Sequence, residues 1–388
     1  MVLPIDTALA VERLDVFVLR APADPPVQTS FGTMRDRPAV LLRVVDAHGV
    51  FGWGEVWCNF PVVGAEHRAR MAATYLRPLV CGQRFDSPLA CFEALTDKLS
   101  VLALQCGEPG TLQQIVAGLD VAVWDLVARR AAMPLWRLLS PAAGPARPAP
   151  VALYASGINP TQPEKLAAAK LAEGYRAFKM KVGFGAERDA ANLQAVRDAI
   201  GADAPLMVDA NQAWNMGEAI AAGRRMERFG LAWLEEPVRA DASPADWARL
   251  AVEQPLVLAG GENLAGMPQF ASFIGARGMS VVQPDLGKWG GFSGCVQVGR
   301  LALQHGKTFC PHWLGAGIGL TASFHLKAAV GGPGYVEVDA NPNPLREVLA
   351  VPGFALSEGA VQLDDRPGLG VVPDLVACRD FIVEVPGT

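Results

Sequence analysis

Residues 206–237, "LMVDANQAWNMGEAIAAGRRMERFGLAWLEEP", contain the unit that repeats through the second half of the chain. An apolar run that ends at Asp209 is followed by a stretch with helical spacing, and a second apolar run then ends at Glu235. The same step recurs from residue 151 onward, and the strand candidates are "VALYAS", "AFKMKV", "LMVDAN", "AWLEEP", "LVLAGGEN", "SVVQPD", "KTFCPH" and "YVEVDAN". Eight such runs over roughly 200 residues predict a (β/α)8 barrel, a modified TIM barrel, across residues 141–350.

The chain before the barrel has another rhythm. Residues 12–57 contain β-rich runs such as "LDVFVLR" and "AVLLRVVD", whereas residues 64–137 carry apolar residues at helical spacing. This order predicts an α+β capping domain over residues 1–140. The Pro- and Ala-rich stretch 140–150 is expected to be a linker, and the β-rich tail 351–388 is expected to pack back on the capping domain.

Composition narrows the class of protein. The formal net charge is -5 and no long basic run occurs, so a nucleic-acid partner is not expected. No uninterrupted apolar stretch of about 18 residues suggests a membrane span, and the N-terminal segment does not resemble a signal peptide. The seven cysteines form no CxxC pair, which favours reduced thiols and a cytoplasmic location.

Polar side chains stand at the ends of seven consecutive strand candidates, each about one βα unit from the next. They are Lys181, Asp209, Glu235, Glu262, Asp285, His312 and Glu337. Each acid alone could be a helix N-cap, and the histidine alone could be structural. One shared pocket at the mouth of the barrel accounts for all of them together, because the strand ends of a barrel converge there.

The stretch "KMK" places Lys179 and Lys181 two residues apart in a strand, so both ammonium groups share one face. Lysine acts as a base only when it is deprotonated, and a neighbouring like charge together with burial lowers its pKa. We therefore expect one of the two lysines to be a base and the other to tune it and contact a substrate carboxylate. The residues alone leave open which lysine has which role.

Three of the strand-end acids predict a metal site. Asp209, Glu235 and Glu262 offer only hard oxygen donors, a set that favours Mg2+ over zinc.

A second acid–base group is predicted across the mouth of the barrel. A carboxylate on the strand before His312, namely Asp285, can fix the histidine tautomer. Such a constellation suits removal of a weakly acidic proton next to a substrate carboxylate, with Glu337 as a possible hydrogen-bond donor to that carboxylate.

The motifs "KMK", "VDAN", "WLEEP", "GGEN", "QPDLGKWGG" and "CPHWLG", with "GWGE" at 52–55 and "RPGLG" at 366–370, resemble the mandelate racemase group of the enolase superfamily over nearly the whole chain. The resemblance implies Mg2+ bound by Asp209, Glu235 and Glu262, one base at Lys181, and a second base in the Asp285–His312 dyad. It implies that Glu337 bonds the substrate carboxylate and that Asn211 makes a polar contact near the metal. It also implies a homo-oligomer.

The loops of the capping domain should cover the mouth of the barrel and select a small carboxylate substrate. They combine apolar side chains with Arg35, Arg37, Trp57 and Asn59, and the arginine and amide groups favour a hydroxylated or dicarboxylic acid. Surface salt bridges are the alternative role for the two arginines. We expect a Mg2+-dependent acid sugar dehydratase. The alternatives are a racemase or epimerase of a 2-hydroxy acid, and a non-catalytic carboxylate-binding barrel.

Overall fold

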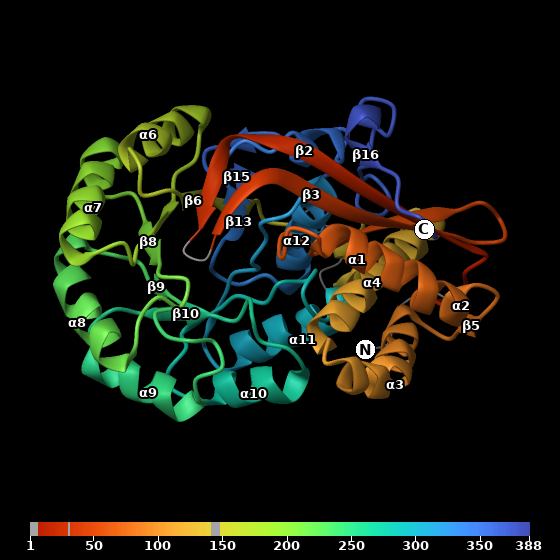
Figure 1. Ribbon diagram of the computed structural model, residues 1–388, viewed down its shortest axis with the longest axis horizontal. Helices are drawn as coiled ribbons and strands as arrows, with labels where there is room; N and C mark the ends of the chain where they lie inside the picture. The colour runs from red at the N-terminus through yellow and green to blue at the C-terminus, as the bar shows by residue number, and fades with distance from the viewer. Residues whose placement is uncertain (1–6, 30–31, 141–147) are drawn as a thin grey trace.

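The computed structural model describes residues 7–29, 32–140 and 148–388. Figure 1 shows two groups of elements side by side, an N-terminal group of strands and helices and a ring of helices around short strands. The predicted linker 140–150 falls mostly outside the described residues. The division of the chain near residue 140 therefore stays a prediction.

The N-terminal part is built on an antiparallel sheet with the order β16-β2-β3-β4. Its strands are β2 (Arg13–Thr29), β3 (Gly32–Val45), β4 (Phe51–Val56) and β16 (Ile382–Val383). A short pair, β1 (Leu9–Ala10) and β5 (Arg84–Phe85), lies beside it. The helical elements are α1 (Gly64–Met71), η1 (Ala72–Leu76), α2 (Arg77–Val80), α3 (Pro88–Cys106), α4 (Pro109–Arg130) and α5 (Leu135–Leu139).

Helix α4 approaches strand β4 so closely that only glycine fits between them. A Cβ atom on Gly54 would lie 1.9 Å from the Gly118 carbonyl oxygen, and one on Gly52 would lie 2.0 Å from the Ala122 carbonyl oxygen. The glycines of "GWGE" thus allow α4 to lie in the core. By length and composition α4 could cross a membrane, but 83% of its apolar window is buried inside the molecule, as is usual for a core helix.

Gly54→Ala is expected to lower the free energy of unfolding by about 3 kcal/mol or more, because the new methyl group overlaps the α4 backbone, which cannot yield. Gly110→Ala is the matched control, since its Cβ in the same helix would meet only the end of Gln114 at 4.0 Å. Urea denaturation of both variants measures the difference. Equal stabilities would show that the contact between α4 and β4 relaxes freely.

The barrel strands form one parallel row, β13-β6-β7-β8-β9-β10-β11-β12. They are β6 (Val151–Ile158), β7 (Phe178–Lys181), β8 (Leu206–Asp209), β9 (Leu234–Glu235), β10 (Leu258–Gly260), β11 (Val281–Val282), β12 (Thr308–Phe309) and β13 (Val336–Asp339). The ends of the row meet where the Glu337 N–H donates to the Pro311 carbonyl oxygen at 3.4 Å. The predicted eight-stranded barrel is confirmed.

Seven helices follow the first seven barrel strands and cover the outside of the barrel (Figure 1). They are α6 (Pro163–Glu173), α7 (Ala186–Ile200), α8 (Met216–Met226), α9 (Pro244–Glu253), α10 (Met267–Gly275), α11 (Gly291–Gln304) and α12 (Gly317–Val330). The short elements η3 (Glu227–Phe229) and α13 (Pro344–Val348) complete this part of the chain.

The tail contacts both parts of the molecule. Strand β16 pairs with β2, and η4 (Arg379–Phe381) precedes it. The pair β14 (Leu356–Ser357) and β15 (Ala360–Val361) instead adds to barrel strand β6. The tail therefore extends the barrel sheet as well as the N-terminal sheet.

The buried side chain of His325 forms hydrogen bonds to both the helical part of the chain and the C-terminal tail. The His325 Nδ1 atom accepts a hydrogen bond from the Trp136 N–H at 3.1 Å, and its Nε2 atom lies 3.2 Å from the Leu369 carbonyl oxygen. This pattern fits the neutral tautomer with the proton on Nε2. Burial lowers the pKa of His325 to about 4, against an ordinary value of 6.5.

Because the unfolded chain takes up this proton below pH 6.5 and the folded chain does not until about pH 4, acidification across that window should cost about 2 to 3 kcal/mol of stability. His325→Gln should be less stable at pH 7 yet lose that much less between pH 7 and pH 4.5. Chemical denaturation at both pH values measures it, with the exposed His48→Gln as control. Identical pH dependence in wild type and His325→Gln would contradict a neutral His325.

Candidate active site

The barrel register brings the predicted groups together. Lys181 pairs with Asp209, and Asp209 pairs with Glu235, across three adjacent strands. An isolated parallel bridge joins Asp285 to His312. The side chains at these strand ends are therefore neighbours at one end of the barrel.

Both lysines of "KMK" are buried and paired with carboxylates. The Lys179 Nζ atom lies 2.6 Å from Glu235, 2.8 Å from Glu337 and 3.9 Å from Asp209. The Lys181 Nζ atom lies 2.6 Å from Asp209 Oδ2. Two like charges are tolerated on one strand face because carboxylates from the neighbouring strands surround them.

The expected low pKa of Lys181 is not found. Burial lowers the pKa, and Lys179 lowers it further, but the Asp209 carboxylate and Glu262 outweigh both and raise it above its usual value. Lys179 thus acts in the predicted direction. The sequence interpretation failed to include the ion pair between Lys181 and Asp209.

The three predicted metal ligands point to different partners. Glu235 accepts hydrogen bonds from Lys179 and, at 2.6 Å, from the Gln283 amide, whereas Asp209 accepts from the Asn211 N–H at 2.7 Å. Glu262 lies 3.0 Å from the Lys288 Nζ atom. Within residues 7–29, 32–140 and 148–388, no three His, Cys, Asp or Glu side chains are gathered as metal ligands.

The charge of this region nevertheless suits a hard divalent cation. Burial raises the pKa of Glu235 to about 7, with Asp209, Glu337 and Glu262 adding to the rise and Lys179 opposing it. Burial likewise raises the pKa of Glu236 to about 8, and Glu262 and Asp209 add to it. These buried carboxylates repel one another, and a cation held by their oxygens would relieve the repulsion.

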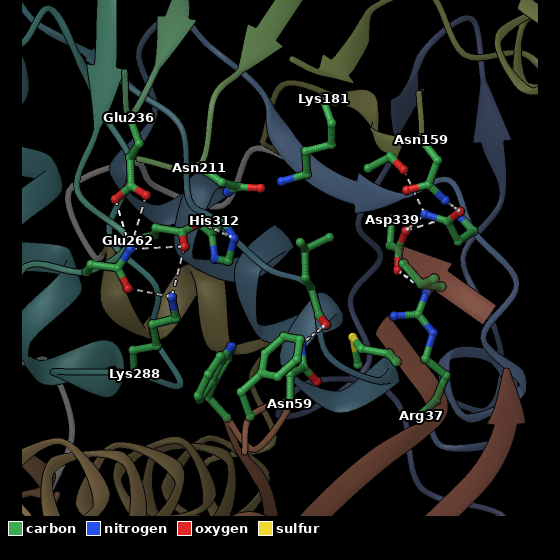
Figure 2. A pocket seen from close by; sticks show the side chains of 18 of the residues that line it. Arg37, Asn59, Asn159, Lys181, Asn211, Glu236, Glu262, Lys288, His312 and Asp339 are labelled. Atoms are coloured by element: carbon green, nitrogen blue, oxygen red, sulfur yellow. Dashed lines mark hydrogen bonds and ion pairs between the residues drawn. The ribbon is translucent and has the colours of Figure 1, made fainter. Parts of the chain in front are cut away.

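His312 faces Lys181 across the cavity (Figure 2). Its Nδ1 atom lies 2.6 Å from Asp285 Oδ2, and its Nε2 atom lies 2.5 Å from Glu262 and 3.4 Å from Glu337. Burial alone would lower the pKa of His312, but Glu262 and Glu337 raise it well above its usual value. Asp285 is itself held by the Gly287 and Lys288 N–H groups at 2.8 and 3.0 Å, which fixes the ring.

A cavity of about 160 Å³ lies between the barrel mouth and the N-terminal part. Its wall includes Lys181, Asn211, Glu262 and His312 from the barrel. The N-terminal part contributes Val27, Met34, Arg37, Trp57, Asn59 and Phe60. Of the predicted substrate contacts, Asn211, Trp57 and Asn59 line the cavity. Asp209 and Glu235 lie behind the wall.

Arg35 does not line the cavity. The β2–β3 register shifts between the pairs Pro22–Asp36 and Val27–Met34, so Arg35 falls in the irregular segment, and its side chain is exposed. Arg37, the other arginine named from the sequence, is buried and lines the cavity.

Several cavity residues escaped sequence reasoning. Glu236, Lys288, Asn159, Asp339 and Asn341 all line the wall. For Asp339 a pattern existed, because it lies two residues beyond Glu337 on the same strand and therefore on the same face. No such pattern existed for Glu236. Its φ of 38° takes it out of strand geometry and turns its side chain toward Asn263, whose amide donates to Glu236 Oε1 at 2.9 Å.

Glu55 joins the N-terminal part to the barrel. Its carboxylate accepts hydrogen bonds from the Ala316 and Gly319 N–H groups, at 2.6 and 2.9 Å, at the start of α12. Two residues further on, the Trp57 ring lies over Lys288, with 4.9 Å from Nζ to the ring centroid. The "GWGE" stretch thus packs against α4, and the residues just after it contribute Trp57 to the cavity wall.

Comparison with known proteins gives a consistent family. Residues 13–140 match the model of the mandelate racemase/muconate lactonizing enzyme N-terminal domain, and residues 163–377 match the enolase C-terminal domain-like model. The chain is 31% identical to a D-galactarolactone cycloisomerase from Agrobacterium fabrum, covering 94% of this chain and 96% of the relative. It is 30% identical to an arabinonate dehydratase from Saccharolobus solfataricus, covering 76% and 78%.

Solved structures of similar proteins indicate the same family. A mandelate racemase/muconate lactonizing enzyme from Bordetella bronchiseptica is 50% identical, with a TM-score of 0.89 and coverage of 96% of this chain and 99% of that one. A racemase from Streptomyces coelicolor with bound magnesium is 28% identical, with a TM-score of 0.85 and coverage of 96% and 100%.

Proposed function

Since the chain belongs to the mandelate racemase group of the enolase superfamily, we propose that it is a Mg2+-dependent enzyme that removes the proton α to a carboxylate and dehydrates an acid sugar. The observation that carries the proposal is the pair of proton-transfer groups in one cavity. Lys181 and the Asp285-bound His312 both line it, from strands on different sides of the barrel.

The proposed Mg2+ ligands are Asp209, Glu235 and Glu262. Their oxygens are of the kind that Mg2+ prefers, and burial together with the neighbouring carboxylates Asp209, Glu337 and Glu262 raises the pKa of Glu235 to about 7, which supports a place for a cation. When bound, the ion would stabilise the negative charge that develops on the substrate carboxylate as the α-proton leaves.

The buried lysine and its acid partner suit the substrate carboxylate. Lys179 donates to Glu235, lies 2.8 Å from Glu337 and lies 3.4 Å from the Tyr154 hydroxyl, so one of these contacts would give way for it to donate to a substrate oxygen. The Ser156 hydroxyl donates to Glu337 and orients it. We propose that Lys179 and Glu337 hold the substrate carboxylate at the base of the cavity.

Lys181 is the proposed base, and His312 is the proposed acid that protonates the departing β-hydroxyl. Lys181 would have to leave its contact with Asp209 before its amine could accept the α-proton. The imidazole of His312 already stands among carboxylates that favour its protonated form, as a general acid requires.

Racemisation or epimerisation is the second candidate, because two groups that face one another can exchange a proton on either face of the α-carbon. Amide-rich walls at Asn159 and Asn341 favour a hydroxylated substrate and, with it, a leaving group. The similarity to an arabinonate dehydratase supports the same choice.

A library of acid sugars incubated with the protein and Mg2+ tests the proposal. We expect at least one member to give a 2-keto acid, with solvent deuterium entering the α position. Exchange without a keto product would select the racemase candidate. Neither result with any member would contradict the proposed chemistry.

A further inference from the structure

One end of the cavity lies away from the proposed metal ligands and is built from side chains that take no part in the proposed proton transfer. Figure 2 shows Arg37, Asp339 and Asn159 gathered there, opposite Glu262 and Lys288. With Asn341 and Gly157 they form a wall that we call the amide end.

Arg37 is already paired. Its Nη2 atom donates to Asp339 Oδ2, its Nε atom donates to the Pro342 carbonyl oxygen at 3.3 Å, and the two charged side chains are only 3% and 6% exposed. The other oxygen of Asp339 accepts from the backbone and side-chain N–H groups of Asn341, at 3.0 and 2.8 Å. The ion pair is therefore neutral in charge.

The amides next to it are oriented by their bonds. The Asn341 amide donates to the Gly157 carbonyl oxygen at 2.9 Å, and the Asn159 amide donates to Asn341 Oδ1 at 3.0 Å. This leaves Asn159 Oδ1, which is buried and has no hydrogen-bond partner among the described residues. A buried acceptor beside a cavity calls for a donor, and a substrate hydroxyl supplies one.

Gly157 keeps this wall open. Its φ is 70°, and a Cβ there would lie 3.0 Å from the Asn341 amide and 3.1 Å from Asp339. The second lining lysine, Lys288, lies at the opposite end, bonded to Glu262 and Asn263. Among the described lining residues, the amide end thus has Arg37 as its cation, and Asp339 neutralises it.

We infer that the substrate carries a single carboxylate, held near Lys179, and ends in hydroxyl groups at the amide end. The substrate class is then the aldonates rather than the aldarates. A second carboxylate would lie against Asp339 and Asn159 Oδ1, both acceptors, without an unpaired cation to meet it. This inference rests on the proposed function, since it names the substrate class of the same site.

Matched pairs test it directly. Gluconate with glucarate, and galactonate with galactarate, share their hydroxyl configuration and differ at the terminal carbon alone. With Mg2+, we expect kcat/KM for an accepted aldonate, followed by deuterium exchange and keto-acid formation, to exceed that of its aldarate at least about tenfold.

Asp339→Asn should reverse the preference. It removes the negative charge and leaves Arg37 free to bind a carboxylate, so the aldonate-to-aldarate ratio should fall at least about tenfold. Asp36→Asn is the matched control, because Asp36 pairs with Arg20, 2.8 Å away and outside the cavity. That variant should keep the wild-type ratio. If Asp339→Asn fails to fold, Asn159→Lys adds a cation at the same end and should shift the ratio the same way.

The outcomes separate the two claims. An aldarate used as well as or better than its aldonate, or a ratio unchanged in the folded variants, overturns the single-carboxylate inference and leaves the proposed chemistry standing. No exchange with either class overturns the proposed function, and this inference with it.

Discussion

His312→Asn is expected to lose dehydration activity by roughly 10²–10⁴-fold, the usual worth of a positioned general acid. Asparagine fills similar space and can still hydrogen-bond Asp285, but it cannot deliver a proton to the departing hydroxyl. The contacts at 2.6 Å to Asp285 and 2.5 Å to Glu262 hold the ring in place before substrate binds. Steady-state rates of keto-acid formation measure the loss.

His305→Asn is the control for this change, because His305 is exposed near the end of α11 and does not line the cavity. It should retain wild-type activity. A His312→Asn protein that is folded and dehydrates within a few-fold of wild type would remove the histidine from the chemistry.

Asp209→Asn is expected to cost on the order of 10³-fold in rate, since several kcal/mol of charge stabilisation would be lost with the metal. The amide keeps the size of the side chain and loses the charge. Wild type should also melt at a higher temperature when Mg2+ is added, because binding to the folded state alone stabilises it, and Asp209→Asn should lose that shift.

Asp203→Asn is the matched control, because Asp203 is exposed. It should keep both the activity and the Mg2+-dependent shift in melting temperature. Thorough chelation of wild type should act like Asp209→Asn. Full activity after chelation would contradict the metal assignment, whatever the melting temperatures show.

The sequence predicted the barrel because its repeat is regular. Each apolar run is short, bounded by a helical stretch, and closed by a polar residue, and parallel strands must place those residues at one end. The seven strand-end groups from Lys181 to Glu337 follow from this periodicity, and the register of β7, β8 and β9 brings the first three together.

What the sequence did not predict depends on local departures from regular geometry. Of the two arginines considered, Arg37 lines the cavity and Arg35 lies where the β2–β3 register shifts, and no periodic pattern in the sequence predicts that shift. The positive φ of Glu236 turns it to the cavity while its neighbour Glu235 turns to Lys179.

The lysine pKa shows a different limit. The "KMK" spacing correctly predicts that Lys179 lowers the pKa of Lys181. It cannot give the strength of the Asp209 contact, which comes from a residue 28 positions away and reverses the net direction.

Deuterium exchange at the α-carbon by Lys181→Ala and His312→Asn tests the opposed arrangement of the two groups most directly. An accepted acid sugar and its α-epimer, each incubated with Mg2+ in deuterium oxide, present the proton on opposite faces. We predict that Lys181→Ala stops exchange with one epimer and spares the other, and that His312→Asn does the reverse. Equal loss with both epimers in both variants, with folding and the Mg2+-dependent melting shift intact, would contradict two proton-transfer groups on opposite faces of the substrate.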